Sequence, residues 1–492
     1  MSNGEGIQPG VGAALAALES ANPSSWLVGG AVRDRLLGRS TTDYDVVVDG
    51  DVRQAARGVA RAINAYAFEL SAHFGAWRVV PRTREGAGGP VGERSGEQRW
   101  QLDVLPVLHG SIEADLALRD LTINALAEPL RGGDLVDPFG GVGDLGARRV
   151  RMVSAEAFQR DPLRVLRLAR LACELAFEVE PQTAVQARAA APGLGSISPE
   201  RIFEELKRIV CAQEALRGLQ LMDELEITPA VLPEVSELRG VEQSRFHHLD
   251  VHAHTRAVMS EAIELQATPQ RHLGECWERV DTFMAAPLAN GLTRWQALRF
   301  GALLHDIAKP QTRAVSAEGR VTFMGHDAAG AEEATRILAR LRTSERLRGH
   351  VAALVRRHLR LGFLVHEAPL SRRAIYRYLR DCGPVAVDVT VLSVADRLAT
   401  RGDRAEQAIA SHLDLADRML CEAMRWLQEP PRPPLRGDEL AAALGVVPGP
   451  ALGEILAELQ EAAFAKEIGS REEAITVARR LLDAQSSAGG DR

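Results

Sequence analysis

Lysine is almost missing from this sequence: among its 59 basic residues, only Lys207, Lys309 and Lys466 are lysines. Arginine therefore carries nearly all the positive charge, as a planar fork that binds phosphates and base edges, although a GC-rich genome would produce the same bias. The formal net charge is −7, so a nucleic-acid partner would have to bind a local basic patch. Aromatic residues make up only 4% of the chain, which argues against extensive base-stacking platforms.

Cysteine and long apolar runs are also scarce. Five scattered cysteines, with no CxxC pair among them, argue against a thiolate zinc site and for a reducing compartment. No apolar run approaches the roughly 20 residues that a membrane helix needs. The first twenty residues contain no Lys or Arg, so they lack the basic region of a secretory signal. We therefore expect a cytoplasmic protein with no membrane partner. The cysteines are Cys173, Cys211, Cys276, Cys382 and Cys421.

The length of 492 residues exceeds what one hydrophobic core usually supports, so several domains are expected. The pattern of strand-like and helical runs along the sequence predicts an α/β head followed by three all-α parts. The last part contains the proline-rich linker Pro430–Pro434. The predicted boundaries are 1–152, 153–235, 236–405 and 406–492. In the head, four runs predict strands, and the Gly- and Arg-rich stretch Arg82–Arg99 predicts a hairpin loop or a disordered insert. The strand runs are Trp26–Gly29, Tyr44–Val48, Trp77–Val80 and Trp100–Val104.

A glycine pair follows the first of these strands. Gly29-Gly30 precedes a short helical segment, Ala31–Leu37. Two glycines there would let backbone N–H groups approach a phosphate at a helix N-terminus. A tight turn with no ligand explains the same pair, and the sequence leaves that alternative open.

Two aspartates follow on the next strand. Asp43 and Asp45 are two residues apart, so on a strand they project to the same side. Adjacent carboxylates repel unless a cation lies between them, and Mg²⁺ prefers such hard oxygen ligands. A solvent-facing edge strand is the alternative, but the apolar run Val46–Val48 argues against it. A third acid, Asp103, lies in another apolar strand and could complete a two-metal site.

Asp43 and Asp45 lie in the first of five sequence motifs, which occur along this chain in the same order as in one known family. Together they resemble the head of class II tRNA nucleotidyltransferases and bacterial poly(A) polymerases, within the polymerase-β-like superfamily. The first motif reads GGAVRDRLLGRSTTDYDVVV in this chain. The next three correspond to the family's motifs RRDFTINALA, DPFGG and EDPLRxLR, and the fifth corresponds to its last core motif. Here they occupy residues 29–48, 118–127, 137–141, 160–167 and 198–206.

The resemblance implies roles for individual residues. Asp43 and Asp45 would be catalytic acids that hold Mg²⁺. Asp103 joins them as a candidate catalytic acid from its strand position, not from the resemblance. Asp161 and Arg164 would form a protein template that hydrogen-bonds the base edges of CTP and ATP, and tRNA would be the partner. The nucleotide-binding set that the resemblance implies is Gly29, Gly30, Arg33, Arg119, Asp120, Asn124, Asp161, Arg164 and Arg167.

Two departures from the family pattern concern base selection. Arg160 replaces the acid that normally precedes Asp161, and Asp161 could simply cap its helix. Only 11 residues separate Asp103 from Asp115, whereas CCA-adding members carry a longer flexible loop there, associated with the change from C to A addition. A CC-adding enzyme is therefore an alternative to a CCA-adding one.

Histidines are concentrated in the third part of the chain: residues 236–405 hold 10 of the 13. His305-Asp306 is flanked by apolar Leu303, Leu304 and Ile307, and a buried charge there requires a partner, for which a metal is suitable. The order of these residues resembles the HD phosphohydrolase superfamily, in which bound Mn²⁺, Ni²⁺, Co²⁺ or Fe activates a water. The ligands that the resemblance implies are His254, His305, Asp306, His326, His358 and Asp396.

Four other histidines have no such assignment, and surface positions are expected for them; they are His247, His248, His252 and His350. The C-terminal segment 435–453 resembles the tRNA-holding tail of family members.

The combined resemblance implies a tRNA nucleotidyltransferase that adds C and A to tRNA 3′ ends from CTP and ATP, with a phosphohydrolase domain. Two alternatives remain besides the CC-adding enzyme: a poly(A) polymerase, and an HD hydrolase whose head only binds RNA. A non-catalytic RNA-binding scaffold would leave both sets of acids unexplained.

Overall fold

The computed structural model describes residues 9–72, 75–82, 100–243, 249–367, 369–401 and 405–488. The chain divides into two compact units between Val231 and Leu232, and each unit is described separately. All but the first residue of the predicted insert Arg82–Arg99 lies outside the described residues, as do His247 and His248. Among the described residues, no helix has both the length and the apolar character that crossing a membrane requires.

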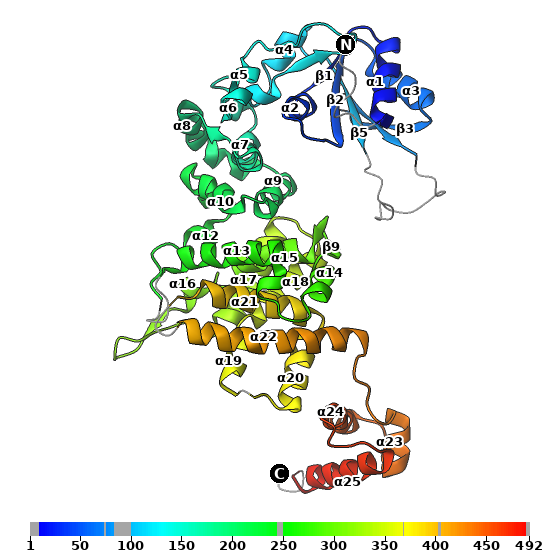
Figure 1. Cartoon of the computed structure of the whole chain (residues 1–492), viewed down its shortest axis with the longest axis vertical. Coiled ribbons are helices and arrows are strands. Elements are labelled where there is room, and N and C mark those ends of the chain that lie inside the picture. The colour runs from blue at the N-terminus through cyan, green and yellow to red at the C-terminus, as the bar shows by residue number, and fades with distance from the viewer. Residues whose placement is uncertain are drawn as a thin grey trace. The chain divides into compact units, whose positions relative to one another are not determined.

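The first unit contains a six-stranded mixed sheet with the order β3-β4-β5-β2-β1-β6. Figure 1 labels β1, β2, β3 and β5 of this sheet. Only the pair β2–β5 is parallel, and the other neighbouring pairs are antiparallel. Each of the four predicted strands overlaps one of these, whereas β3 and β6 were not predicted. The strands are β1 (Ser25–Val28), β2 (Asp43–Val48), β3 (Ala65–Ser71), β4 (Ala76–Pro81), β5 (Gln101–Pro106) and β6 (Ala127–Pro129).

The two faces of this sheet differ in character because side chains alternate along each strand. The back face presents buried apolar residues such as Tyr44, Val46 and Leu102. Against it packs α3 (Val52–Ala62), whose apolar residues recur on one helical face, and α1 (Pro9–Ala21) packs against α3. The acids predicted from the sequence therefore project from the opposite, front face.

The remaining elements of the first unit are mostly short until α7, after which the chain is mainly helical. In α7, Leu163 and Leu166 are buried, and α9 and α10 pack against this helix. These helices are α2 (Gly30–Leu36), α4 (Ile112–Leu116), α5 (Gly141–Gly146), α6 (Ala157–Arg160), α7 (Leu163–Leu175), α8 (Pro181–Ala190), α9 (Pro199–Cys211), α10 (Ala215–Glu224) and α11 (Ile227–Val231). One further strand pair joins β7 (Arg149–Val150) to β8 (Glu178–Val179).

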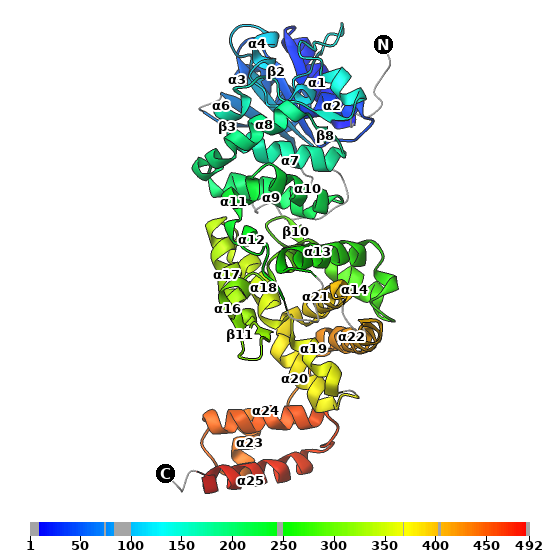
Figure 2. The ribbon, with the colours of Figure 1, turned by 90° about the vertical axis from the view of Figure 1, so that its left-hand side faces the viewer.

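In the second unit, α21 (Ala386–Ala399) is the central helix. It is buried almost all round, as expected of a helix that is apolar on every side, and α13, α15, α18 and α22 pack around it. The helices of this bundle, several of which are labelled in Figure 2, are α12 (Pro233–Ser236), α13 (Val251–Ala267), α14 (Trp277–Met284), α15 (Arg294–Leu304), α16 (Lys309–Thr312), α17 (His326–Arg340), α18 (Glu345–Arg357), α19 (Arg360–Leu364), α20 (Arg372–Cys382), α21 and α22 (Ala405–Gln428). Its two small hairpins are β9 (Pro287–Ala289) with β10 (Leu292–Thr293), and β11 (Ala314–Val315) with β12 (Val321–Thr322).

A disulfide links Cys276, which precedes α14, to Cys421 in α22. The sequence argument that scattered cysteines remain thiols is therefore wrong for these two. It fails because residues 145 positions apart in the sequence become neighbours only when α14 and α22 pack together. Cys173 and Cys382 are buried free thiols.

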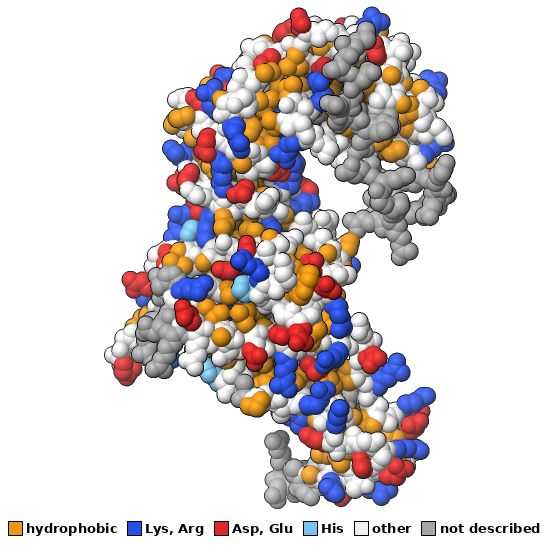
Figure 3. Space-filling model, viewed as in Figure 1, with side chains coloured by type: hydrophobic (Ala, Val, Ile, Leu, Met, Phe, Trp, Pro, Cys, Tyr) orange, Lys and Arg blue, Asp and Glu red, His pale blue; other side chains and the backbone are white. Residues whose placement is uncertain are grey.

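The C-terminal part of the second unit is a small three-helix cluster: α23 (Gly437–Leu444), α24 (Pro450–Phe464) and α25 (Arg471–Ala488). Leu440, Ile455 and Leu459 are among the residues that form its own apolar core. On the face of the second unit seen in Figure 3, basic and acidic side chains are interspersed and no single sign prevails.

Candidate active site and candidate metal centre

A cavity of about 970 Å³ lies over the front face of the head sheet. Eleven of the predicted catalytic and nucleotide-binding residues line it, although they come from strands, turns and helices far apart in the chain. Asp161 does not line it. The lining residues predicted from the sequence are Gly29, Gly30, Arg33, Asp43, Asp45, Asp103, Arg119, Asp120, Asn124, Arg164 and Arg167.

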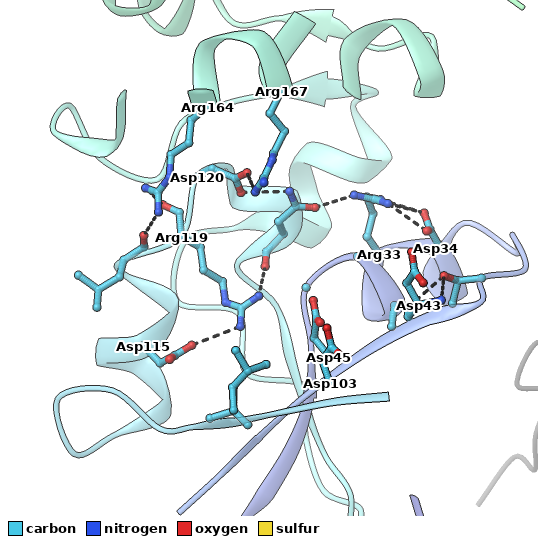
Figure 4. Close-up of a pocket in the computed structure, with 18 of the residues that line it drawn as sticks. Arg33, Asp34, Asp43, Asp45, Asp103, Asp115, Arg119, Asp120, Arg164 and Arg167 are labelled. Atoms are coloured by element: carbon cyan, nitrogen blue, oxygen red, sulfur yellow. Dashed lines mark hydrogen bonds and ion pairs between the residues drawn. The ribbon is translucent and has the colours of Figure 1, made fainter. Parts of the chain in front are cut away.

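The carboxylates of Asp45 and Asp103 lie side by side in this cavity, which Asp43 also lines (Figure 4). Asp45 and Asp103 are register partners across the parallel pair β2–β5, and Asp43 lies two residues before Asp45 on the same face. Burial raises the pKa of Asp45, and repulsion from Asp103 and Asp43 adds to this effect, while Arg119 opposes it. A group of oxygen ligands that disfavours its own negative charge is suited to a divalent cation.

Asp103 has a second partner that the sequence did not reveal. The Nε of Arg78 in β4 donates to Asp103 Oδ1 at 2.7 Å, and its NH2 donates to Oδ2 at 2.8 Å. Because Asp103 pairs with Arg78 in the antiparallel ladder β4–β5, the two side chains project from the same face. A metal-binding role for Asp103 therefore requires it to share its carboxylate with Arg78.

The geometry of the turn favours glycine at position 29. Gly29 has φ +72°, and a Cβ there would lie 2.7 Å from a guanidinium nitrogen of Arg119. The following residue begins α2, whose Arg33 side chain packs over Gly30. Arg33 donates to both oxygens of Asp34 at 2.9 Å and to Asn124 Oδ1 at 2.7 Å.

Asp120 is buried and anchors part of the cavity wall. It accepts hydrogen bonds from the backbone N–H of Leu121 at 2.8 Å, from Asn124 Nδ2 at 3.1 Å and from Arg167 NH1 at 3.1 Å. Burial alone would raise the pKa of this carboxyl, but Arg167 and the other donors outweigh burial and hold the pKa below its usual value. The resemblance assigned Asp120 to nucleotide binding. In this structure Asp120 lines the cavity, and its carboxylate holds Asn124 and Arg167, which line it as well.

The two predicted template residues, Asp161 and Arg164, bind different partners in this structure. Asp161 Oδ1 accepts from the backbone N–H of Leu163 at 3.2 Å, which is the capping role considered as an alternative, and Oδ2 accepts from Arg201 NH2 at 2.7 Å. Arg164 donates to the carbonyl of Leu118 at 2.7 Å (Figure 4). It also donates to the carbonyls of Ala157 at 3.2 Å and Arg119 at 3.3 Å.

The second unit brings together all six residues predicted as HD ligands. Two groups of three have ligand atoms that lie within 4.8 Å of one another: His254, His305 and Asp396 in one, Asp306, His326 and His358 in the other. Asp306 joins them, since its carboxylate lies 3.1 Å from His305 Nε2 and 3.4 Å from His326 Nε2.

Three of the histidines are held in the same tautomer by the backbone. His305, His326 and His358 each present Nδ1 to the carbonyl three residues earlier, at 2.9, 2.7 and 2.6 Å respectively. A ring that donates from Nδ1 keeps the lone pair on Nε2 for a metal. The Nε2 atoms of His305 and His326 and the Oδ1 of Asp306 are buried and make no hydrogen bond within the described residues, so a metal ion fits this donor set.

The pKa shifts of His358 and Asp306 agree with this assignment. Burial alone would lower the pKa of His305, but the carboxylates of Asp306 and Asp396 outweigh burial and raise it. Burial and the nearby His305 lower the pKa of His358 to about 4, so its ring is neutral. Burial alone would raise the pKa of Asp306, but His305 and Lys309 hold it well below its usual value. Neutral imidazoles and ionised carboxylates are the forms that bind metals.

Sequence reasoning missed two residues in this unit. Lys309 Nζ lies 2.6 Å from Asp306 Oδ2 and donates to Gln243 Oε1 at 2.6 Å; the spacing of three residues from Asp306 was the available signal. The expected surface position of His350 is wrong, because it is buried with its Nε2 3.3 Å from the buried carboxylate of Asp388.

A second cavity, of about 640 Å³, opens over the metal-ligand cluster. Its floor includes Asp306, His326 and His358. Phe323 also lines it, as do Met324 and Phe363, whose side chains are 84% and 66% exposed. The cavity thus combines candidate metal ligands with an apolar rim.

Three known family models match successive segments of the chain, in the same order as the domains predicted from the sequence. Residues 25–151 match the model of the poly A polymerase head domain, residues 176–238 match the probable RNA and SrmB-binding site of polymerase A, and residues 282–401 match the HD domain.

Three curated proteins are similar over most of the chain. An A-adding tRNA nucleotidyltransferase of Deinococcus radiodurans is 36% identical over 94% of this chain and 96% of its own length. A CC-adding tRNA nucleotidyltransferase of Thermus thermophilus is 34% identical over 91% of both chains. A multifunctional CCA protein of Halorhodospira halophila is 35% identical over 68% of this chain and 72% of its own.

Solved structures share the fold. A CCA-adding enzyme in complex with ATP superposes with a TM-score of 0.65, at 18% identity, over 97% of both chains. The Thermotoga maritima CCA-adding enzyme complexed with tRNA superposes with a TM-score of 0.60, at 17% identity, over 98% of this chain and 97% of that one.

Proposed function

Because this chain belongs to the tRNA nucleotidyltransferase family, we propose that it adds C and then A to tRNA 3′ ends from CTP and ATP, without a nucleic-acid template. The observation that carries this proposal is the set of three carboxylates, Asp43, Asp45 and Asp103, in one arginine-lined cavity. Poly(A) polymerases share the head motifs, but the HD match over residues 282–401 favours the tRNA enzyme.

The reaction joins the terminal 3′-oxygen of the RNA to the α-phosphorus of the nucleotide and breaks the bond to pyrophosphate. Asp43 and Asp45, with Asp103, would hold Mg²⁺, which lowers the pKa of the attacking hydroxyl and neutralises the leaving charge. The Gly29-Gly30 turn and Arg33 would bind the triphosphate. Asp120 would act indirectly, because it orients Arg167 and Asn124 through the hydrogen bonds described above.

Base selection would depend on Asp161 and Arg164, whose polar groups must turn from their present partners toward a base edge. The A-adding relative, the CC-adding relative and the multifunctional CCA protein have about the same sequence identity to this chain, at 36%, 34% and 35%. The sequence identity to these relatives therefore does not indicate which of the three nucleotide specificities this chain has. The short interval between Asp103 and Asp115 favours efficient CC addition and slower A addition, with a CC-adding enzyme as the alternative.

For the second unit we propose a metal-dependent phosphohydrolase activity on RNA ends or nucleotides. The supporting observation is the set of Nε2 lone pairs kept available by backbone acceptors. Nitrogen-rich ligation suits Mn²⁺, Ni²⁺, Co²⁺ or Fe, which would supply a hydroxide nucleophile when bound. The apolar rim of Phe323, Met324 and Phe363 offers a contact surface for a base or sugar.

The proposed division of labour follows the predicted boundaries. Residues 1–152 would carry nucleotidyl transfer, 153–235 base selection and RNA binding, 236–405 phosphohydrolysis, and 406–492 tRNA holding. A tRNA-processing role also supports the cytoplasm as the site of action.

The deciding experiment incubates the pure protein with tRNA lacking CCA and each nucleotide alone, in the presence of Mg²⁺. Addition of C to this RNA supports the proposal. Long homopolymeric A tails would identify a poly(A) polymerase instead, and no addition of any nucleotide would leave the HD hydrolase as the function.

A further inference from the structure

The edge strand β3 carries an unusual surface for a protein with so few aromatic residues. Tyr66 and Phe68 are 54% and 47% exposed. Among the described residues, Phe363 at the second cavity is the one other aromatic side chain that is similarly exposed. Single exposed apolar side chains are common on protein surfaces and need no explanation. Exposed apolar side chains that lie next to one another more often mark a site that contacts a ligand or a partner.

The register of the sheet places these rings on the catalytic face. Phe68 pairs with Arg78 in the β3–β4 ladder, and Tyr66 pairs with Val80. Arg78 in turn pairs with Asp103, and Asp103 pairs with Asp45. Because paired residues of neighbouring strands project to the same side, one row of side chains crosses the front face from the catalytic acids to Phe68.

The opposite side of β3 is occupied by other contacts. Ala67 pairs with the buried Val79, and Glu69 pairs with Trp77, over which Arg57 of α3 lies 5.2 Å from the ring centroid. Packing against α3 therefore does not involve Tyr66 or Phe68. The apolar core of the head gives no reason for aromatic residues at these two positions.

The chemistry of the proposed reaction indicates what approaches this surface. The triphosphate would bind at the Gly29-Gly30 turn and Arg33, next to β1 in the sheet order. In-line displacement puts the attacking hydroxyl opposite the leaving pyrophosphate. The RNA end must then approach from the far side of the acids, over β5, β4 and β3.

Arginine side chains lie beside the two rings, although the charge of Arg78 is paired with Asp103. Arg78 lies in the row between Asp103 and Phe68, and it lines the cavity. The guanidinium of Arg82 lies over the Tyr66 ring, 4.8 Å from its centroid. Arginine beside an exposed aromatic ring is the combination that binds single-stranded nucleic acid, by contacts to phosphates and by stacking of bases.

We propose that Tyr66 and Phe68 form a stacking platform for bases near the 3′ end of the RNA substrate. Phe68 lies two strands from Asp103, about 10 Å at ordinary strand spacing. Stacked bases are about 3.4 Å apart, so the platform meets about the third base from the attacking nucleotide. The inference rests on the proposed nucleotidyl transfer to RNA and adds a contact for the RNA strand to it.

The test compares Tyr66→Ala, Phe68→Ala and the double variant with the wild type, using a tRNA acceptor minihelix that lacks CCA. Loss of base stacking is expected to raise the KM and the Kd for this RNA about 5- to 100-fold. The KM for CTP and the kcat at saturating RNA should stay within about twofold. Tyr66→Phe and Phe68→Trp keep an aromatic face and should restore binding.

Two controls separate stacking from general damage to the head. Glu69→Ala changes the other face of the same strand, and Val315→Ala removes an exposed apolar side chain of the second unit; both should bind RNA normally. Minihelices with an abasic site at each of the last four positions give a second readout. At the stacked position, loss of the base and loss of the ring should not be additive.

Several results would overturn the proposal. The proposal fails if the alanine variants bind the RNA as tightly as the active wild type. It also fails if the effects of removing the base and removing the ring are additive at every abasic position. A wild-type dimer that the double variant converts to monomer in sedimentation would identify the surface as a contact between two copies of the chain. A wild type that adds no nucleotide would instead contradict the proposed function itself, and direct binding of the minihelix would still test the platform.

Discussion

Asp45 and Asp103 are neighbours across the one parallel strand pair of the head sheet, β2–β5. Their carboxylates meet because the strands pair in this register, although 57 residues lie between the two positions. A slip of one residue would turn Asp103 to the α3 side of the sheet and bring Leu102 into the cavity. The register of this pair is therefore a condition for the proposed chemistry.

Replacing either of the adjacent acids tests the proposed catalytic centre. Asp43→Ala and Asp45→Ala should each abolish nucleotide addition, because each removes an oxygen ligand whose cation contributes several kcal/mol to transition-state stabilisation. The measurement is single-nucleotide extension of tRNA lacking CCA, with circular dichroism to monitor folding. Asp49→Ala, an exposed acid just beyond β2, is the matched control and should retain activity. Comparable extension by an Asp45 variant at saturating Mg²⁺ and CTP would exclude the assignment.

The two proposed activities should separate by mutation. His305→Ala is expected to lose bound transition metal and phosphohydrolase activity, because it removes a buried ligand whose Nε2 faces Asp306. Nucleotide addition should stay within about twofold, since no residue of the head cavity is changed. Metal analysis and hydrolysis of 2′,3′-cyclic nucleotides measure the first effect, with His272→Ala as the control. If the metal-loaded wild type hydrolyses no phosphoester, the hydrolase assignment fails.

The terminal A tests the base-selecting groups. Switching from C to A requires Asp161 and Arg164 to meet a differently shaped base edge, and each buried polar group left unsatisfied costs about 1–3 kcal/mol. A addition should therefore be slower than C addition by roughly tenfold to a hundredfold, or absent. A gel compares tRNA ending in CC, given ATP alone, with tRNA lacking all three nucleotides, given CTP alone. Equal rates would mean that the short Asp103–Asp115 interval does not limit the enzyme.

Asp144 should make the head sensitive to acid. This buried carboxylate accepts hydrogen bonds from Thr122 Oγ1 at 2.6 Å, Arg149 Nε at 2.8 Å and Arg151 Nε at 2.9 Å. Burial alone would raise its pKa, but these bonds outweigh burial and lower it. A depressed folded-state pKa gives stability that is fully present above the unfolded pKa of about 4 and is lost as pH falls through the folded value.

The variant Asp144→Asn tests this assignment. It should cost about 1–3 kcal/mol at neutral pH and reduce the loss of stability on acidification below about pH 4. Hydrogen exchange of the segment 120–153 measures this local stability against pH. An Asn variant that is as stable as the wild type at neutral pH would contradict the prediction.

The Cys276–Cys421 disulfide should stabilise the second unit. All the candidate metal ligands except His254 lie within the loop that it closes. A disulfide typically contributes about 2–4 kcal/mol to stability, so reduction, or Cys276→Ser, should lower the unfolding temperature of this unit. Nucleotide addition by the head gives the control readout. An unchanged melting curve under reducing conditions would contradict the expected stabilisation.

Local sequence patterns were sufficient for some features of this protein. Asp43 and Asp45 alternate with apolar residues on a strand, so their shared face follows from the period of two. The Gly29-Gly30 turn and the buried His305-Asp306 pair were likewise visible, because the chemistry of each depends on residues adjacent in the chain. The resemblance to a family then placed distant residues in one site by their order.

Other features depended on the packing of distant segments. Strand β3 was not predicted, although it carries the exposed Tyr66 and Phe68, and Arg78 could not be matched with Asp103 before the sheet order was known. The ion pair between Asp161 and Arg201 was likewise not predicted, because the two residues are 40 positions apart in the sequence. The assignment of Asp161 to a nucleotide stays a prediction.

The sequence by itself determined the local elements, the order of the motifs and the residue types available for phosphate and metal binding. The tertiary structure alone decided which of those residues share a cavity, that His350 is buried against Asp388, and that Cys276 meets Cys421. The physical reason is that strand register and helix packing are set by burial of apolar surface over the whole unit. The spacing of residues within one helix or strand predicts only the direction in which their side chains leave that element.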